Sequence, residues 1–246
     1  GDVEAVSADT SESYAALFFN VDTREVLYAK NIYDRLYPAS TTKLMTALLA
    51  LEHGNLDSPV TVSQEAITFH ENGVSTARLK AGDSLTVRQL LYALLLPSAN
   101  DAANVIAEAV GGSMDQFAGM MNEKAQALGA TGSHFVNANG LQDENHYTTA
   151  HDMALIFQQA IKNQDFLDII GTQSFTIEPT NMNPESRVLN THHALLSASA
   201  PEHYDGCFGG KTGVTAASKN TLVSGAARNG MTLIAVAMRA DAGQVC

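Results

Sequence analysis

Residues 38–50 read PASTTKLMTALLA, a run whose Leu, Met and Ala residues favour a helix. Ser40 and Lys43 are three residues apart in this run, and residues at that spacing share a helix face. A serine hydroxyl becomes a good nucleophile when a neighbouring base takes its proton. A lysine amine acts as that base when burial or a nearby cation lowers its pKa. Because the pair is also an ordinary helix start with an exposed lysine, it decides nothing alone.

Two further motifs follow in order. Ser98-Ala99-Asn100 comes after an apolar run that ends at Pro97, so we expect a loop leading into a second helix. Helix capping alone would also favour Ser and Asn there. Lys211-Thr212-Gly213 alone indicates a strand edge carrying one lysine. Together, S-x-x-K, S-x-N and K-T-G are typical of penicillin-binding proteins and class A β-lactamases, which use an active-site serine.

The chain resembles the serine-type D-alanyl-D-alanine carboxypeptidases, which are low-molecular-weight penicillin-binding proteins, from about Tyr14 to Met238. Residues 38–46 resemble the nucleophile helix of that family. Residues 98–102 resemble its Ser-Gly-Asn-Asp-Ala loop, with Ala99 in place of glycine. The stretches that separate these carboxypeptidases from their relatives are matched at residues 134–135, 139–141 and 147–154.

The resemblance implies a role for each motif residue. Ser40 is expected to attack the carbonyl between the two D-alanines that end a peptidoglycan stem peptide, with Lys43 as the general base. Ser98 would relay a proton to the departing D-alanine, and Asn100 would position the substrate amide or Lys43. Lys211 would add positive charge that holds Lys43 neutral and polarises Ser98. Water would then hydrolyse the acyl-enzyme, so neither a cofactor nor a metal is expected.

The strand at the third motif is expected to bind the substrate. By resemblance, Thr212 faces the terminal carboxylate, and the backbone N–H groups of Ser40 and Val214 form the oxyanion hole. Gly213 would leave room for the ligand to lie against the strand. Penicillins would mimic D-Ala-D-Ala, acylate the nucleophile and leave slowly.

The family often has a further basic residue that binds the carboxylate. His192 is only a weak candidate for that role here, and Arg239 is another. None of the eight histidines has the spacing of a helical zinc site, so we expect no metal ligands among them.

Two alternative functions remain. A class A-like β-lactamase would use a loop glutamate to activate water, and Glu178-Pro179 resembles that loop. It lies 80 residues after Ser98, much further than in those enzymes, so we predict instead that it ends a strand at residues 173–177. A penicillin-binding sensor domain would acylate but turn over slowly, and release of D-alanine would distinguish it.

Length and charge limit the function further. The 246 residues suit a single catalytic domain of two lobes over 1–246, with 1–13 as a flexible leader. The formal charge of −12 argues against nucleic acid, and no apolar run is long enough for a membrane span. The resemblance implies an exported protein at the extracytoplasmic face of the bacterial membrane or in the periplasm. We do not expect the family's C-terminal helix, stalk domain or membrane anchor within these 246 residues.

The pattern predicts a mixed α/β (α+β) fold resembling the β-lactamase and penicillin-binding transpeptidase fold. One antiparallel sheet is expected from both chain ends, flanked by helices, with a helical lobe over one side of the active site. The expected strands are 14–21, 25–30, 220–227 and 231–238, the last two joined by an Asn229-Gly230 turn. The expected helices are 40–51, 87–96, 101–110, 113–128 and 152–162. Cys207 and Cys246 should be free thiols, because they fall at opposite ends of parallel strands.

Overall fold

A computed structural model describes residues 12–71 and 73–241. Its main sheet has five antiparallel strands in the order β2-β1-β9-β8-β7. Both ends of the chain contribute to this sheet, as predicted. The strands are β1 (Ser13–Asn20), β2 (Glu25–Lys30), β7 (Cys207–Thr215), β8 (Lys219–Arg228) and β9 (Met231–Ala240). Ser13 already pairs with Ala240, so the predicted leader boundary at residue 13 is wrong, and residues 1–11 lie outside the described part.

The turn between β8 and β9 follows directly from its dipeptide. Asn229 and Gly230 have φ values of 52° and 76°. Positive φ at both central residues gives the type I′ turn, whose twist matches that of the flanking strands. The alternating residues Ile234, Val236 and Met238 of β9 are then buried on one face of the sheet.

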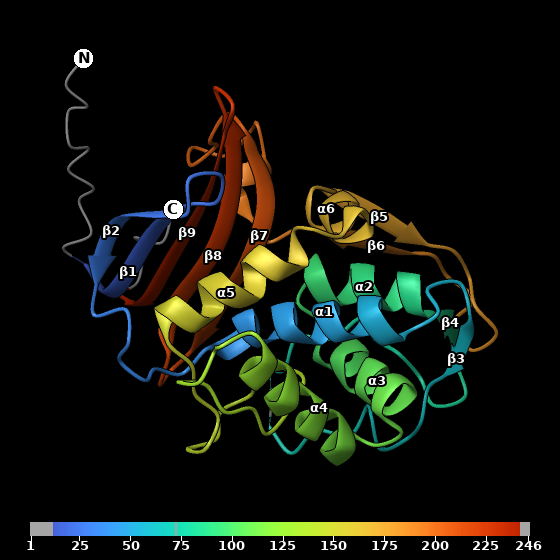
Figure 1. The fold of residues 1–246 in the computed structure, drawn as a ribbon. Coiled ribbons are helices and arrows are strands. Elements are labelled where there is room, and N and C mark those ends of the chain that lie inside the picture. Colours follow the sequence, from blue (N-terminus) through green and yellow to red (C-terminus); the bar gives the residue numbers. More distant parts are fainter. Residues whose placement is uncertain (1–11, 72, 242–246) are drawn as a thin grey trace.

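Helices form the second layer and the predicted helical lobe (Figure 1). α5 packs against β9, β1 and α1, while α1 also contacts α2, α3 and α4. The helices are α1 (Lys43–His53), α2 (Val87–Leu95), α3 (Asn100–Gly111), α4 (Met114–Ala127), α5 (Ala150–Ala160) and α6 (Gln164–Ile170). None of these helices is long and apolar enough to cross a membrane.

Several short elements were not predicted or differ from the prediction. The expected helix at 40–51 begins with a 3₁₀ turn, η1 (Ala39–Thr42), so Ser40 precedes α1. A second such turn is η2 (Ala194–Leu196). Two small antiparallel sheets of two strands each pair β3 (Pro59–Thr61) with β4 (Ser84–Thr86) and β5 (Ser174–Ile177) with β6 (Arg187–Asn190). The strand predicted at 173–177 is therefore confirmed as β5.

Side-chain caps explain why the helices begin where they do. Thr86 and Gln89 form a reciprocal capping box at α2. Ser113 accepts a hydrogen bond from the backbone N–H of Gln116 at α4, as its sequence pattern predicts. Gly129 follows α4 with a φ of 77°, which suits a glycine stop.

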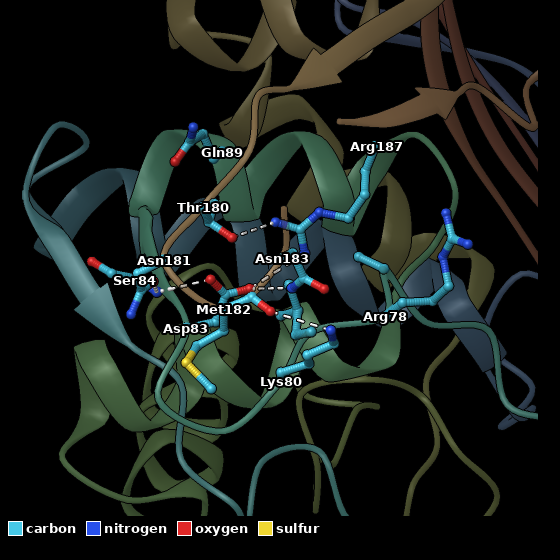
Figure 2. Close-up of polar contacts among 12 residues, drawn as sticks. Arg78, Lys80, Asp83, Ser84, Gln89, Thr180, Asn181, Met182, Asn183 and Arg187 are labelled. Atoms are coloured by element: carbon cyan, nitrogen blue, oxygen red, sulfur yellow. Dashed lines mark hydrogen bonds and ion pairs between the residues drawn. The ribbon is translucent and has the colours of Figure 1, made fainter. Parts of the chain in front are cut away.

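A buried ion pair fastens the β5–β6 hairpin to the turn before β4 (Figure 2). Asp83 is fully buried, and its Oδ2 lies 3.4 Å from Nη1 of Arg187 and accepts a 2.7 Å hydrogen bond from Asn183. Ser84 donates its backbone N–H to Asn181 at 2.8 Å. β6 leads directly to His192, which lines a cavity of about 670 Å³, so these contacts fix one wall of that cavity.

Arg187→Met should lower the free energy of unfolding by about 3–5 kcal/mol, because it leaves the buried Asp83 carboxylate without its cation. Urea denaturation measures this change. Arg88→Met is the matched control, since Arg88 pairs with Asp57 and Asp165 while its side chain remains 37% exposed. The control should lose about 1 kcal/mol or less. Equal losses in the two variants would show that the buried pair does not stabilise the hairpin.

Candidate active site

The three sequence motifs converge on one cavity of about 670 Å³. It lies between the start of the helical lobe and the edge strand β7. Its lining includes most of the residues predicted from the motifs: Ser40, Ser98, Asn100, Lys211, Thr212, Gly213 and Val214. Lys43 is fully buried directly behind Ser40.

The Lys43 amine has three close neighbours. Its Nζ lies 2.9 Å from Oγ of Ser40, 2.6 Å from Oδ1 of Asn100 and 2.6 Å from the carbonyl oxygen of Asn139. The amide and carbonyl oxygens can only accept hydrogen bonds. A neutral amine has two hydrogens for these two oxygens, and its lone pair then remains for the Ser40 hydroxyl proton. The geometry therefore suits a base that removes the proton from Ser40.

Burial provides the electrostatics that such a base needs. Desolvation lowers the pKa of Lys43 well below its usual value, and the nearby Lys211 cation lowers it further, whereas Asp101 opposes both. Burial also lowers the pKa of Lys211 to about 7. Nζ of Lys211 donates to the Thr212 carbonyl at 2.7 Å. The effect of Lys211 on Lys43 has the direction that its predicted role requires.

Ser98 combines a strained backbone with an unused hydroxyl. Its φ of 61° is uncommon for a residue with a side chain. Its Oγ is buried and has no hydrogen-bond partner among residues 12–71 and 73–241. Strain and unpaired polar groups of this kind gather at functional sites, where a ligand completes the bonding. The Ser98 hydroxyl can therefore form a hydrogen bond with a ligand in the cavity.

Asp101 anchors a wall of the cavity that the sequence motifs did not reveal. Its carboxylate accepts backbone N–H bonds from Ala77 at 2.9 Å and from Leu79 at 3.0 Å. The backbone N–H of Asn100 donates to the Ser75 carbonyl at 2.8 Å. Residues 71 and 73–75, which belong to the same loop, line the cavity. The start of α3 therefore holds this loop over the site.

Asn139 and Gly140 were noted in the sequence only as family-like residues, yet they belong to the site. The Asn139 carbonyl is one of the two fixed acceptors for Lys43. Gly140 has a φ of 88°, and a Cβ placed on it would lie 2.0 Å from the Ala39 carbonyl oxygen. Only glycine lets this loop approach η1 so closely. A backbone acceptor leaves no side-chain signal, which explains why sequence reasoning missed it.

Gly213 also permits a close approach, but for a different reason from the one predicted. A Cβ on Gly213 would lie 2.7 Å from the backbone nitrogen of Ser40 and 3.1 Å from Cβ of Ala39. The space beside Gly213 is therefore occupied by η1 itself. This contact sets the Ser40 N–H beside β7, where Val214 is 67% exposed on the open edge of the sheet.

Of the residues predicted with less support, His192 lines the cavity, whereas Arg239 and Glu178 do not. His192 lines the cavity, half-buried, and burial lowers its pKa with a further contribution from Lys211. Arg239 does not join the cavity, because its guanidinium lies 5.4 Å from the centre of the Tyr14 ring and lines another hollow. Glu178 is exposed, interacts with Ser186 at 3.4 Å and is not part of the lining.

Two further predictions concern metals and cysteines. Within the described ranges, no three His, Cys, Asp or Glu side chains are grouped as a metal site would require. Cys207 is a free thiol and, as predicted, β7 and β9 are parallel to each other because each pairs antiparallel with β8. Cys246 lies outside the described residues.

His146 contacts Thr42 of η1, the 3₁₀ turn that also contains Ser40. The backbone N–H of Val136 donates to Nδ1 of His146 at 3.0 Å, so the ring proton is on Nε2. That nitrogen lies 2.7 Å from Oγ1 of Thr42 and donates to it. Burial lowers the pKa of His146 to about 4, so the ring stays neutral in the folded protein at neutral pH. It thereby joins the 133–148 segment to η1.

Comparisons with known proteins identify the family. Residues 2–242 match the D-alanyl-D-alanine carboxypeptidase family of peptidases, S11. The fold is that of solved DD-transpeptidases and carboxypeptidases: a serine-to-alanine mutant of the Streptomyces K15 DD-transpeptidase superposes with a TM-score of 0.87 at 33% identity, covering 94% of this chain and 92% of that one. The chain therefore belongs to the D-alanyl-D-alanine carboxypeptidase family.

Curated relatives agree with this assignment. The Mycobacterium tuberculosis carboxypeptidase DacB2 is 38% identical, with 89% of this chain and 72% of the relative covered. The Bacillus subtilis carboxypeptidase DacF is 34% identical over 94% of this chain. The chain spans 58% of the length of DacF and 81% of the Streptomyces K15 carboxypeptidase, which is 35% identical over 94% of this chain.

Acid should destabilise the protein through its buried histidines. The pKa of His146 is about 4 in the folded protein, against an ordinary value of 6.5. The stability that its neutral ring contributes is therefore fully present above pH 6.5 and is lost as the pH falls toward 4. The loss should be about 3 kcal/mol for this histidine. Urea unfolding at several pH values would measure it.

The variant His146→Gln should flatten this pH dependence because it removes one proton-binding group. His193, whose pKa burial and Lys211 also lower to about 4, keeps its own share. His53→Gln, at the exposed end of α1, controls for the substitution itself. An unchanged acid slope in His146→Gln would show that His146 is not the group responsible.

Proposed function

We propose that this protein is a serine D-Ala-D-Ala carboxypeptidase that removes the terminal D-alanine from peptidoglycan stem peptides through an acyl-enzyme on Ser40. The observation that carries the proposal is the Lys43 amine. It is buried, 2.9 Å from the Ser40 hydroxyl, and held by two oxygens that only accept hydrogen bonds. Family membership supports the substrate class.

Acylation follows from this geometry. Lys43 removes the Ser40 proton as Oγ attacks the carbonyl carbon between the two D-alanines. The negative oxygen that forms is stabilised by the backbone N–H groups of Ser40 and Val214, each worth about 2.7–4 kcal/mol in such sites. The proton on Lys43 passes through the unpaired Ser98 hydroxyl to the departing amine, and free D-alanine leaves. Water then attacks the ester and regenerates Ser40.

The open edge of β7 orients the peptide. An extended peptide that adds to this edge forms main-chain hydrogen bonds with it. Its terminal carboxylate belongs at the cationic end, near Lys211 and the Thr212 hydroxyl, with His192 in the same lining. The residues before the cleaved bond then run toward Thr215. The peptide is therefore antiparallel to β7.

The same site accounts for two further parts of the proposal: inhibition by penicillins and action outside the cytoplasmic membrane. A penicillin carries a strained amide and a carboxylate, so it can acylate Ser40 while its carboxylate takes the place of the terminal D-alanine. The stem peptide lies outside the cytoplasmic membrane, so the enzyme acts at the extracytoplasmic face. Asn100 and Lys211 complete the set of catalytic residues.

A transpeptidase is the second candidate, because the solved relative from Streptomyces K15 is named a DD-transpeptidase. Both reactions share the acyl-enzyme and differ only in whether water or an amine resolves it. A β-lactamase of class A type is less well supported, since Glu178 lies away from Ser40. A sensor domain would form the acyl-enzyme and release it slowly. Product analysis with a D-Ala-D-Ala peptide separates all of these.

Incubation with a penicillin should add its mass to Ser40, because among residues 12–71 and 73–241 this is the one hydroxyl hydrogen-bonded to the Lys43 amine. Peptide mapping by mass spectrometry locates the adduct. Ser40→Ala should lose both the adduct and D-alanine release, while Ser98→Ala should still label Ser40, more slowly. An adduct on Ser98, or undiminished labelling of Ser40→Ala, would remove Ser40 from its role.

Lys43→Arg should lower the acylation rate nearly as much as Lys43→Ala, by about 10²–10⁴-fold. Arginine keeps the positive charge but cannot be deprotonated in proteins. Stopped-flow measurement with a fluorescent penicillin gives the rate. Thermal unfolding checks that both variants fold. If Lys43→Arg acylated at a substantial fraction of the normal rate, Lys43 would be an electrostatic partner and not the base.

A further inference from the structure

Asn104 is a buried asparagine on the face of α3 that also carries Asn100. The two residues are four positions apart, so their side chains lie one above the other on the helix. Asn104 is only 6% exposed and is not part of the lining of the main cavity. None of the three sequence motifs contains it. A buried amide needs partners for both its oxygen and its nitrogen, and these partners show what Asn104 holds in place.

The hydrogen bonds around Asn104 fix which way each amide group points. Nδ2 of Asn104 donates to the carbonyl oxygen of Ala66 at 3.0 Å, because a carbonyl can only accept. Oδ1 of Asn104 accepts a hydrogen bond from Nδ2 of Asn139 at 2.9 Å. At the other side of the Asn139 amide, Oδ1 accepts the backbone N–H of Leu141 at 2.8 Å. The Asn139 side chain is therefore held by its own loop and by α3.

The backbone carbonyl of Asn139 connects this restraint to Lys43. That carbonyl accepts a 2.6 Å hydrogen bond from Nζ of Lys43, and Oδ1 of Asn100 accepts another at 2.6 Å. Both acceptors depend on α3, because Asn100 belongs to its first turn and Asn139 is bound to its second turn through Asn104. α3 also packs against α1, which begins at Lys43 (Figure 1). One helix thus sets the position of both acceptors relative to the amine.

We propose that Asn104 is a positioning residue for acylation, which holds the Asn139 carbonyl where it orients the Lys43 amine toward Ser40. The inference rests on the proposed function, because it takes Lys43 as the base. A neutral amine has two hydrogens and one lone pair, and the lone pair faces the Ser40 hydroxyl only while both hydrogens point at their acceptors. A misplacement of about 1 Å in such an arrangement can slow a reaction roughly 100-fold.

Loss of the bond between Asn104 and Asn139 has two expected effects on the amine. The carbonyl remains but loses its fixed distance from Nζ, so the lone pair is no longer aimed at the nucleophile. An acceptor also favours the charged amine, because hydrogen bonds from a charged donor are the stronger ones. A weaker acceptor therefore lowers the pKa of Lys43 further. The charged groups that act on this pKa, Lys211 and Asp101, are unchanged by the substitution.

The test measures the acylation rate with a fluorescent penicillin across a range of pH. Asn104→Leu has nearly the same size as the native residue but offers no acceptor. Its maximal rate should fall by about 10-fold to 100-fold, and the acid limb, where Lys43 becomes charged, should move to lower pH. Asn104→Ser, whose oxygen is one bond nearer the helix, should change both in the same direction and serves if the leucine variant does not fold.

Asn122→Leu is the matched control. Asn122 of α4 also binds the segment that leads to Asn139, because it exchanges two hydrogen bonds with the backbone of Phe135. Its loss should lower the melting temperature but leave the acid limb at the same pH. An Asn104→Leu protein that behaved in the same way, less stable but with an unchanged acid limb and maximal rate, would show a structural role only and would overturn the proposal.

A double variant shows whether Asn104 acts through Asn139. Asn139→Ala keeps the backbone carbonyl but removes the side chain that Asn104 holds. Adding Asn104→Leu to it should slow acylation by less than about twofold more, because coupled residues are not additive. Losses that multiply as they do for independent sites would overturn the proposal.

Titration of the Lys43 amine, followed by NMR of carbon-13-labelled lysine, gives a readout that needs no catalysis. If Lys43→Arg acylated at the normal rate, the proposed base mechanism would fail. A lower pKa of Lys43 in Asn104→Leu than in the native protein would then still support Asn104 as the residue that positions the amine. An unchanged pKa would overturn that role.

Discussion

Burial of one lysine amine is the constraint on which the rest of the site depends. In the proposed mechanism Lys43 takes the proton of Ser40, which a charged amine could not do, so its surroundings must favour the neutral form. Desolvation and the Lys211 cation favour that form, while Asn100 and Asn139 accept hydrogen bonds from the amine. Those two acceptors come from distant parts of the chain. The helical lobe must therefore pack around α1 in a single way.

The proposed catalytic side chains and the sheet could be predicted from sequence because both depend on local chemistry. Ser40, Lys43 and Lys211 belong to residue types and spacings that acyl transfer requires, and the structure gathers them around one cavity. Strand alternation and the Asn229-Gly230 turn likewise depend on nearby residues alone. The presence of both chain ends in one sheet was predicted, whereas the order of its strands was not.

The supporting structure could not be predicted, because it uses main-chain groups and contacts between distant residues. The Asn139 carbonyl has no side-chain signature, and the role of Gly213 depends on η1, which lies far from it in the sequence. The pair of Asp83 and Arg187 joins residues 104 positions apart. The short strands β3, β4 and β6 contain too few residues to show a period. Arg239 was predicted as a ligand of the substrate carboxylate, but it lines a different hollow. The sequence could not show this, because Arg239 lies where the pairing of β8 with β9 shifts register.

The open edge of β7 has a consequence for the protein in concentrated solution. An edge that offers unpaired backbone groups to a peptide offers them equally to a strand of another molecule, and this is a common start of aggregation. Here Val214 is exposed on that edge. The formal charge of −12 works against such contacts, because like-charged molecules repel one another. Colloidal stability should therefore decline as the pH approaches the isoelectric point near 4.9.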